Sequence, residues 1–231
     1  MNIFDRALDF VQDGDVVGLG TGRAATQFIH RLADRVRQGF RVQGVPTSHA
    51  SEELARSLGI PLVTLDDHLP LALTVDGADE VDLELNLIKG YGRALVREKI
   101  VAAASRRLII VVGKEKSVHT LGSRGKLPIE TIPFAVPLVL HRLAALGLSG
   151  VPYTREGRLV LSDNGNAIID AVVSPMEDPA RLERDLVHIP GVVGTGLFLD
   201  MASIVLIGDE ARDFTLLEER RRNDAVGDPG P

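Results

Sequence analysis

The 231-residue chain contains no cysteine and no tryptophan, and only 4% of its residues are aromatic. Disulfides, thiolate nucleophiles and cysteine-ligated metal centres are therefore excluded, and a surface that stacks nucleic-acid bases is not expected. No apolar run approaches the ~18 residues of a membrane span, and residues 1–6 lack a signal-peptide pattern. The 26 basic and 32 acidic side chains give a net charge of −6, which disfavours nucleic-acid binding. These absences predict a cytoplasmic globular protein with neither a nucleic-acid nor a membrane partner.

Short apolar strands alternate with helices along the first half of the chain. Strands are predicted at 16–19, 41–45, 61–65, 71–75 and 108–112. Helices are predicted near 3–11 and at 26–36, 51–58 and 93–105. This alternation is typical of an α/β fold with a mostly parallel sheet that is covered on both faces.

The pattern changes after about residue 126. Helices are predicted at 134–146 and 179–187, and extended segments at 151–154, 158–161, 167–173 and 192–199. This second part is predicted to be a small α+β module. One more apolar strand, Ser203–Ile207, would return the chain to the first sheet, and the charged segment from Leu216 onward is expected to fray.

A glycine-rich turn, Gly18-Leu-Gly20-Thr-Gly22, lies between a predicted strand and a predicted helix. Glycines allow backbone amides to approach an anion closely, and the N-terminus of a helix favours negative charge. The spacing is not that of a dinucleotide-binding turn, and the P-loop lysine is absent. The turn is therefore either a tight turn without a ligand or a site for a phosphate or a sugar.

Four acidic side chains occupy seven positions after the predicted strand at 71–75, namely Asp76, Asp79, Glu80 and Asp82. Ligands of open α/β sheets bind at the carboxyl ends of the strands, so Asp76 and Asp79 either face one pocket or simply form the turn. Like charges at this density favour a cation nearby. Lys89, which precedes a short glycine turn, is one candidate for an oxyanion-stabilising group, and an ordinary solvated lysine is the alternative.

Glu98 is the most informative single residue of the sequence. On the predicted helix its same-face neighbours are all apolar: Ala94, Leu95, Val101 and Ala102. A carboxylate on an apolar face loses hydration, which raises its pKa and makes it a better base near neutral pH. The alternative is a buried glutamate that a structural cation satisfies.

The remaining polar residues give weaker signals. The six histidines lack metal-binding spacing, so no metal site is predicted. Lys114 and Lys116 follow a strand end and are candidates for a phosphate contact, but a solvated charge cluster is the favoured interpretation. Lys126 lies at the predicted junction of the two modules, where pockets often form.

Several motifs occur together in a characteristic order and spacing. They are Val75-Asp76-Gly-Ala-Asp79-Glu80, Ile88-Lys89-Gly90, Arg97-Glu98-Lys99-Ile100-Val101, Leu127-Pro-Ile-Glu130, Asp163-Asn-Gly-Asn166, Ile189-Pro-Gly-Val-Val193 and Gly196-Leu-Phe198. With the turn at 18–22 they span nearly the whole chain. In this combination the sequence resembles the type A family of ribose-5-phosphate isomerases.

The resemblance implies a Rossmann-like catalytic domain, residues 1–127 and 201–231, with a smaller α+β domain, residues 128–200, inserted before the last strand. It implies a homo-oligomer, either a dimer or a tetramer. It also implies interconversion of ribose 5-phosphate and ribulose 5-phosphate in the non-oxidative pentose phosphate pathway, without a metal or an organic cofactor.

The resemblance also assigns roles to particular residues. Glu98 would be the proton acceptor, and Lys89 would stabilise an enediolate. Asp76 would assist ring opening, and Asp79 would orient hydroxyl groups. The substrate site would comprise Thr21, Gly22, Arg23, Ala24, Asp76, Gly77, Ala78, Asp79, Lys89, Gly90, Tyr91, Gly92 and Lys126.

The sequence departs from the family pattern at a few positions. The loop usually continues Gly-Ser-Thr, but Arg23 and Ala24 occupy the last two positions, so a guanidinium that grips phosphate or narrows the pocket replaces a hydroxyl. Tyr91 interrupts the usual Gly-Gly-Gly, and an extra residue leaves Arg124 and Lys126 as alternatives for one basic contact. The alternative functions are therefore an isomerase or deaminase for another sugar phosphate, and a non-catalytic sugar-phosphate sensor.

Overall fold

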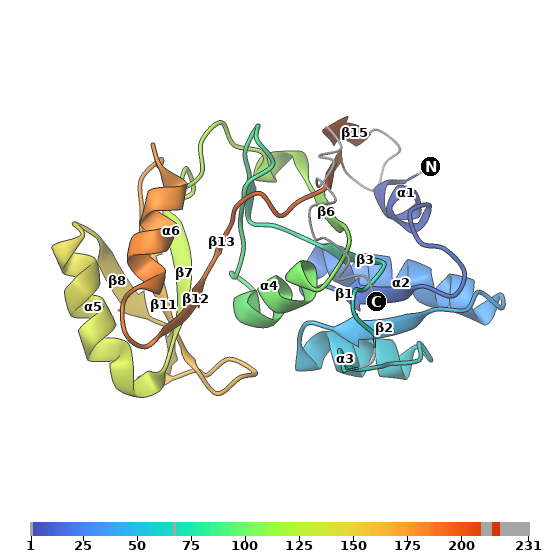
Figure 1. The fold of residues 1–231 in the computed structure, drawn as a ribbon, viewed down its shortest axis with the longest axis horizontal. Coiled ribbons are helices and arrows are strands. Elements are labelled where there is room, and N and C mark those ends of the chain that lie inside the picture. Colours follow the sequence, from blue (N-terminus) through green and yellow to red (C-terminus); the bar gives the residue numbers. More distant parts are fainter. Residues whose placement is uncertain (1, 67, 209–213, 218–231) are drawn as a thin grey trace, which may run out of the picture.

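The computed structural model describes residues 2–66, 68–208 and 214–217, and a six-stranded sheet is its largest element. The strand order is β15-β14-β6-β3-β1-β2. Five strands are parallel, β1 (Val16–Leu19), β2 (Gln43–Pro46), β3 (Leu73–Asp76), β6 (Leu108–Val112) and β14 (Ile204–Gly208), and β15 (Phe214–Leu217) is antiparallel to β14. Figure 1 shows this sheet in the half of the molecule that holds both α1 and α2.

Helices cover both faces of this sheet. Successive side chains of a strand point to opposite faces, and because those of β6 are all apolar, both faces must be shielded from water. Ile109 and Val111 of β6 pack into one core with α1 (Ile3–Leu8), α2 (Arg23–Arg37) and α3 (His49–Ser57). Leu108 and Ile110 point the other way and pack against Ala102 of α4 (Leu95–Ala103). The predicted α/β class with a mostly parallel, doubly covered sheet is confirmed.

A second, antiparallel sheet has the strand order β12-β7-β11-β8, and we propose that it forms the centre of the small domain. Its strands are β7 (Lys126–Thr131), β8 (Ser149–Pro152), β11 (Ala167–Val172) and β12 (Val192–Thr195). The helices α5 (Val136–Ala145) and α6 (Pro179–Val187) pack on it around a core of their own, and β9 (Thr154–Arg155) and β10 (Arg158–Leu159) form a hairpin. We propose that the first domain boundary lies just before Lys126, because β7 is continuous across residues 127 and 128.

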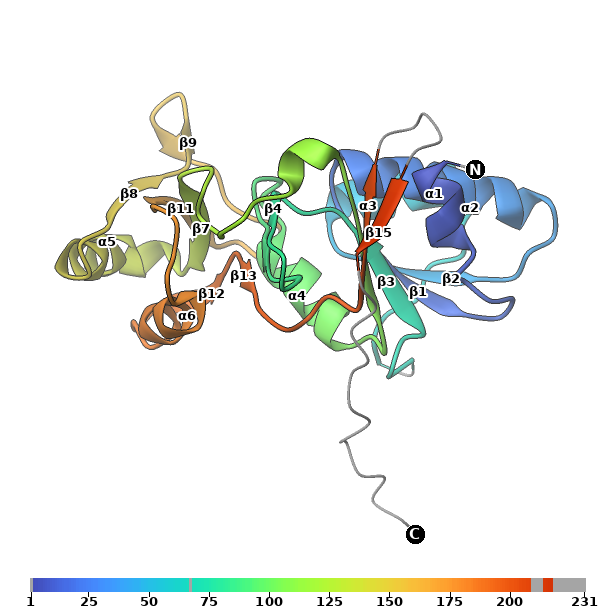
Figure 2. The same ribbon diagram turned by 90° about the horizontal axis from the view of Figure 1, so that it is seen from above.

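A three-stranded sheet lies where the two parts meet, and Figure 2 shows it beside α4. It consists of β4 (Glu80–Val81), β5 (Leu87–Ile88) and β13 (Leu197–Phe198), all antiparallel. In the division into two domains that we propose, the chain enters the small domain just before β7 and leaves it through β13. Two 3₁₀ turns, η1 (Lys114–Lys116) and η2 (Pro133–Ala135), complete the described elements.

Some predicted elements were wrong in extent. Residues 61–65 form no strand beyond a single parallel bridge between Gly44 and Leu62, in which the Gly44 N–H donates to Pro61 and the Val63 N–H donates to Gly44. The pairing extends in neither direction, because Pro61 at one end and Pro46 of β2 at the other have no N–H to donate. The first helix ends at Leu8, and α2 begins three residues earlier than predicted, at Arg23. Residues 216 and 217 belong to β15, and the rest of the predicted frayed tail lies outside the described residues. None of the helices in the described ranges is long and apolar enough to cross a membrane.

Candidate active site

The carboxyl ends of β1 and β3 bring the first site residues together. The Gly20 N–H donates to the Val75 carbonyl (3.0 Å), and the Thr21 N–H donates to Oδ1 of Asp76 (3.1 Å). Gly20 is required here, because a Cβ at this position would lie 2.2 Å from Oδ1 of Asp76. The glycine turn is therefore fitted around the carboxylate that ends β3.

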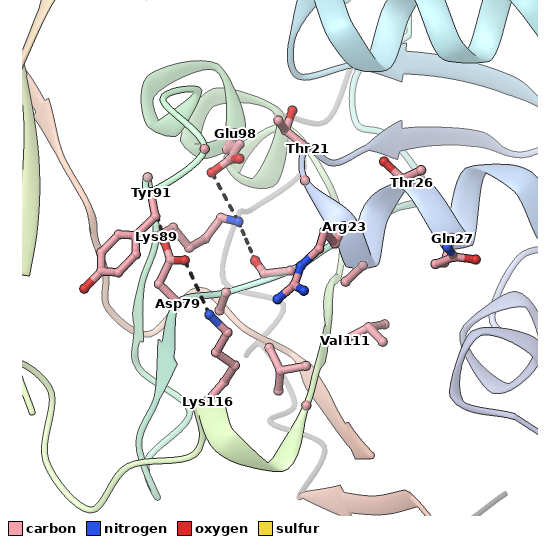
Figure 3. A pocket seen from close by; sticks show the side chains of 18 of the residues that line it. Thr21, Arg23, Thr26, Gln27, Asp79, Lys89, Tyr91, Glu98, Val111 and Lys116 are labelled. Atoms are coloured by element: carbon pink, nitrogen blue, oxygen red, sulfur yellow. Dashed lines mark hydrogen bonds and ion pairs between the residues drawn. The ribbon is translucent and has the colours of Figure 1, made fainter. Parts of the chain in front are cut away.

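Lys89 lies between two carboxylates in the interior of the site. Its Nζ is 3.0 Å from Oδ2 of Asp76 and 3.2 Å from Oε2 of Glu98, and it also donates to the Gly77 carbonyl. All three ionisable side chains are at most 4% exposed. Figure 3 shows the Lys89 ammonium beside the Glu98 carboxylate, with a dashed line between them. One ammonium thus contacts two buried carboxyl groups. The three side chains together carry a net charge of −1 when both carboxyl groups are ionised, and no net charge when one of them is protonated.

The electrostatics of this group favour a basic Glu98. Burial raises the pKa of Glu98 to about 8, although Lys89 opposes that rise. Burial alone would lower the pKa of Lys89, but Asp76 and Glu98 outweigh it and raise that pKa above its usual range. Lys89 therefore remains an ammonium while Glu98 exchanges its proton near neutral pH, which is the range in which a general base is most effective.

A cavity of about 850 Å³ opens in front of Lys89 and Glu98. Its wall combines the turn after β1, the start of α2, the segment after β3, the glycine turn after Lys89 and the segment after β6 (Figure 3). The lining includes Thr21, Gly22, Arg23, Ala24, Gly77, Ala78, Asp79, Lys89, Gly90, Tyr91, Gly92, Glu98 and Lys116. This volume is within the range of small-molecule sites.

Asp79 forms the second acidic group of the cavity. It accepts a hydrogen bond from the Tyr91 N–H (2.9 Å), and its Oδ1 lies 3.8 Å from Nζ of Lys116. Burial raises the pKa of Asp79, while the Tyr91 N–H and the nearby lysines lower it. The cavity thus holds a second carboxyl group for proton exchange with a bound polar ligand.

Two cationic side chains, Arg23 and Lys116, complete the cavity. Arg23 is the first residue of the 15-residue helix α2, whose N-cap is Gly22 with a φ of 96°, and in Figure 3 its guanidinium points into the cavity. Lys116 belongs to η1 and reaches the cavity from the carboxyl end of β6. A cation at the N-terminus of α2 and a second cation in the same cavity make the cavity suitable for a phosphate group.

Comparison with known proteins assigns the family. Residues 43–212 match the family model of ribose 5-phosphate isomerase A (phosphoriboisomerase A). The chain is 48% identical over 208 residues to ribose-5-phosphate isomerase A of Roseiflexus castenholzii, covering 88% of each chain. It is 50% identical over 206 residues to that of Gloeobacter violaceus, covering 89% of this chain and 90% of the relative.

The chain belongs to the ribose-5-phosphate isomerase A family.

Solved structures of the family have the same fold. The ribose 5-phosphate isomerase A of Methanocaldococcus jannaschii superimposes with a TM-score of 0.89 at 37% identity, covering 94% of this chain and 97% of that one. A D-ribose-5-phosphate isomerase in complex with phospho-erythronic acid gives a TM-score of 0.90 at 38% identity, covering 94% and 96%. The resemblance that the motifs indicated is therefore confirmed.

Within this family fold, three predicted site residues lie differently from expectation. Asp76 is 1% exposed and lies behind Lys89, outside the cavity wall. Lys126 is also absent from the wall, because its ammonium lies over the Tyr91 ring at 3.8 Å and 3.8 Å from Asp170. The guanidinium of Arg124 donates to the carbonyl of Glu115 on the exposed side of η1.

The sequence interpretation of Lys116 as a solvated charge was wrong. Its side chain is 19% exposed, lines the cavity and faces Asp79. The available signal was its position four residues after β6, at the carboxyl end of the strand that pairs with β3. Across the described ranges, no group of three or more histidine or acidic side chains is arranged to hold a metal ion.

Proposed function

We infer that the protein interconverts ribose 5-phosphate and ribulose 5-phosphate, and that Glu98 is the base that moves the proton. The observation that carries this inference is the buried Glu98 carboxylate at the cavity wall, with its Oε2 3.2 Å from Nζ of Lys89. Burial raises the pKa of Glu98 to about 8, which suits it to act as a base. An aldose–ketose isomerisation needs one base and one fixed cation at the same place.

The reaction then proceeds through an enediolate. Glu98 removes the proton from C2 of the open-chain aldose, and the electron pair moves through the new C1–C2 double bond to the oxygen on C1. Lys89 stabilises the negative charge that develops there, because its ammonium is desolvated and already in position. A proton then passes from the hydroxyl on C2 to the oxygen on C1, which leaves the negative charge on the C2 oxygen. As protonated Glu98 returns its proton to C1, the electron pair of the C1–C2 double bond forms the new C–H bond, the C2 oxygen becomes the carbonyl, and ribulose 5-phosphate results.

We assign the two aspartates different parts in this scheme. Asp76 holds Lys89 in place and keeps it charged, because its carboxylate contacts Nζ and the N–H groups of Thr21 and Gly77. Asp79 faces the cavity with a raised pKa, which suits it to exchange protons with sugar hydroxyls and to assist ring opening.

The phosphate group is proposed to lie between Arg23, Lys116 and the first amides of α2. Both cationic side chains line the same cavity as Glu98, so one sugar phosphate can contact the base and the cations together. The sequence alone also allowed an isomerase or deaminase for another sugar phosphate and a sugar-phosphate sensor. Preferred turnover of ribose 5-phosphate in a panel of pentose, hexose and amino-sugar phosphates would exclude all three.

The direct test compares Glu98→Gln with Glu84→Gln, a matched change at an exposed position. Ribose 5-phosphate turnover should fall by about 10²–10⁴ in kcat for Glu98→Gln and stay unchanged for Glu84→Gln. Near-normal kcat in Glu98→Gln would show that another group moves the proton.

A homo-oligomer is also proposed. Large apolar side chains are exposed on the small domain, including Phe134 at 94% and Val151 at 63%. Light scattering coupled to gel filtration would give the mass in solution and decide between a monomer, a dimer and a tetramer. The cytoplasmic location remains a prediction from the sequence, which cell fractionation would test.

A further inference from the structure

A loop of the small domain, residues 162–166, contacts α4, which carries Glu98, and the start of α3, which lies next to the glycine turn. It connects β10 to β11 and contains the Asp163-Asn-Gly-Asn166 motif. None of its residues lines the cavity. Its contacts nevertheless lead toward Glu98 on one side and toward the glycine turn on the other.

Glu130 on β7 anchors this loop from the interior. Its side chain is fully buried, and Oε1 accepts three hydrogen bonds, from Oγ of Ser162 (2.8 Å), Nδ2 of Asn164 (3.1 Å) and Nδ2 of Asn166 (2.9 Å). Within the described residues, Oε2 of Glu130 has no hydrogen-bond partner. Burying a carboxylate with one oxygen unpaired is costly, so the three bonds to the loop must compensate for it.

One arm of the loop reaches α4. Asn164 uses both ends of its amide, because Nδ2 donates to Glu130 and Oδ1 accepts from Nε of Arg97 (2.8 Å). Arg97 also donates to the carbonyl of Asp163 (3.0 Å). Arg97 directly precedes Glu98 in α4, so this arm holds the helix that carries the base.

The other arm reaches the glycine turn. Oδ2 of Asp163 accepts from the N–H of His49 (2.7 Å), the first residue of α3. The two residues before it, Thr47 and Ser48, both contact the Thr21 hydroxyl, at 2.7 and 2.8 Å. Thr21 lines the cavity next to Arg23, so this arm holds the turn proposed to bind the phosphate.

We propose that loop 162–166, anchored by Glu130, is a positioning element with two separable actions: Asn164 orients Glu98 for proton transfer, and Asp163 orients the turn that binds the substrate. The proposal rests on the assignment of Glu98 as the base. The small domain would then take part in the reaction through this loop, although no side chain of the loop lines the cavity.

The test separates kcat from KM in two variants of the loop. Asn164→Ala should lower kcat about ten- to a hundredfold with KM within twofold, because a small displacement of a base is enough for such a loss. Asp163→Ala should raise KM about three- to tenfold with kcat within twofold, because the turn is less well ordered before binding. Glu177→Gln, a change on an exposed residue of the same domain, is the control and should match the wild type.

Glu130→Ala should show both effects, and adding it to the Asn164→Ala Asp163→Ala double variant should change neither kcat nor KM further. If Glu130→Ala does not fold, the kinetics of Asn164→Ala and Asp163→Ala are sufficient to test the proposal. Neither of these two side chains is buried, so both variants are expected to fold. Lower melting temperatures with both kinetic constants unchanged would overturn the proposal, as would equal changes of kcat and KM in both variants. Failure of the proposed base is recognised separately, by full activity of Glu98→Gln.

Discussion

Arg23→Ala is the most revealing perturbation of the substrate site. Arg23 lines the cavity at the N-terminus of α2, is exposed, and makes no ion pair with any residue that the structure describes. Its guanidinium is therefore available for an anionic ligand, and its position in Figure 3 points it toward the cavity that holds Lys89 and Glu98. The proposed ligand is the phosphate of ribose 5-phosphate.

The expected magnitude follows from the type of contact. A charge-assisted hydrogen bond contributes about 1.5–3 kcal/mol, and each ~1.4 kcal/mol corresponds to a tenfold change, so kcat/KM should fall about 10–150-fold. Most of the loss should be in KM, because the phosphate does not change charge during the reaction. Inorganic phosphate should also become a weaker competitive inhibitor, by a similar factor.

Steady-state kinetics with ribose 5-phosphate and phosphate inhibition measure both quantities. Arg31→Ala, on an exposed position of the same helix, is the matched control and should behave as the wild type. Values within twofold of wild type for Arg23→Ala would refute the phosphate contact. An improved kcat/KM would show instead that Arg23 narrows the cavity and that the preferred substrate is a different sugar phosphate.

Three further predictions concern the pH profile, Tyr91 in the turn after Lys89, and metal dependence. Because the base must be deprotonated and burial raises the pKa of Glu98 to about 8, kcat/KM should fall about tenfold per pH unit below that value, and a profile flat from pH 6 to 9 would contradict this assignment. Tyr91→Gly should lower the free energy of unfolding by about 2 kcal/mol in urea titrations, since it removes the Lys126 contacts and adds backbone freedom. Tyr91→Phe should lower it by only about 1 kcal/mol, and equal losses would show that the ring contact contributes nothing. Turnover should persist in EDTA, and a loss restored by a divalent ion would contradict the enediolate scheme without a metal.

Glu98 could be predicted as the base from the sequence because the residues that bury it are its neighbours in the chain. The apolar neighbours of Glu98 on α4 lie within four residues of it, and helical periodicity alone places them on one face. Its burial and raised pKa follow directly from that pattern. The strand-helix alternation likewise predicted the parallel sheet, whereas residues 61–65 failed because a short apolar run does not reveal whether hydrogen-bonding partners exist.

The sequence could not show in the same way which charged side chains line the cavity and which are buried behind its wall. Asp76 and Asp79 are equivalent in sequence, but only the packing of Gly20 and Lys89 against Asp76 places it behind the cavity wall. Lys116 was misjudged because its partner, Asp79, is distant in the sequence. The contacts of loop 162–166 with α3 and α4 also join residues more than sixty positions apart, and neither composition nor spacing encodes such contacts.

The close approach of Gly20 to Asp76 has a consequence for how this sequence can vary. Replacing a glycine with alanine is a common way to stabilise a protein, because it reduces the freedom of the unfolded chain. At position 20 that route is closed, since any Cβ would meet the carboxylate, and moving the carboxylate would release the ammonium of Lys89. We therefore expect positions 20, 76 and 89 to vary together, because a larger side chain at position 20 displaces the carboxylate that holds Lys89.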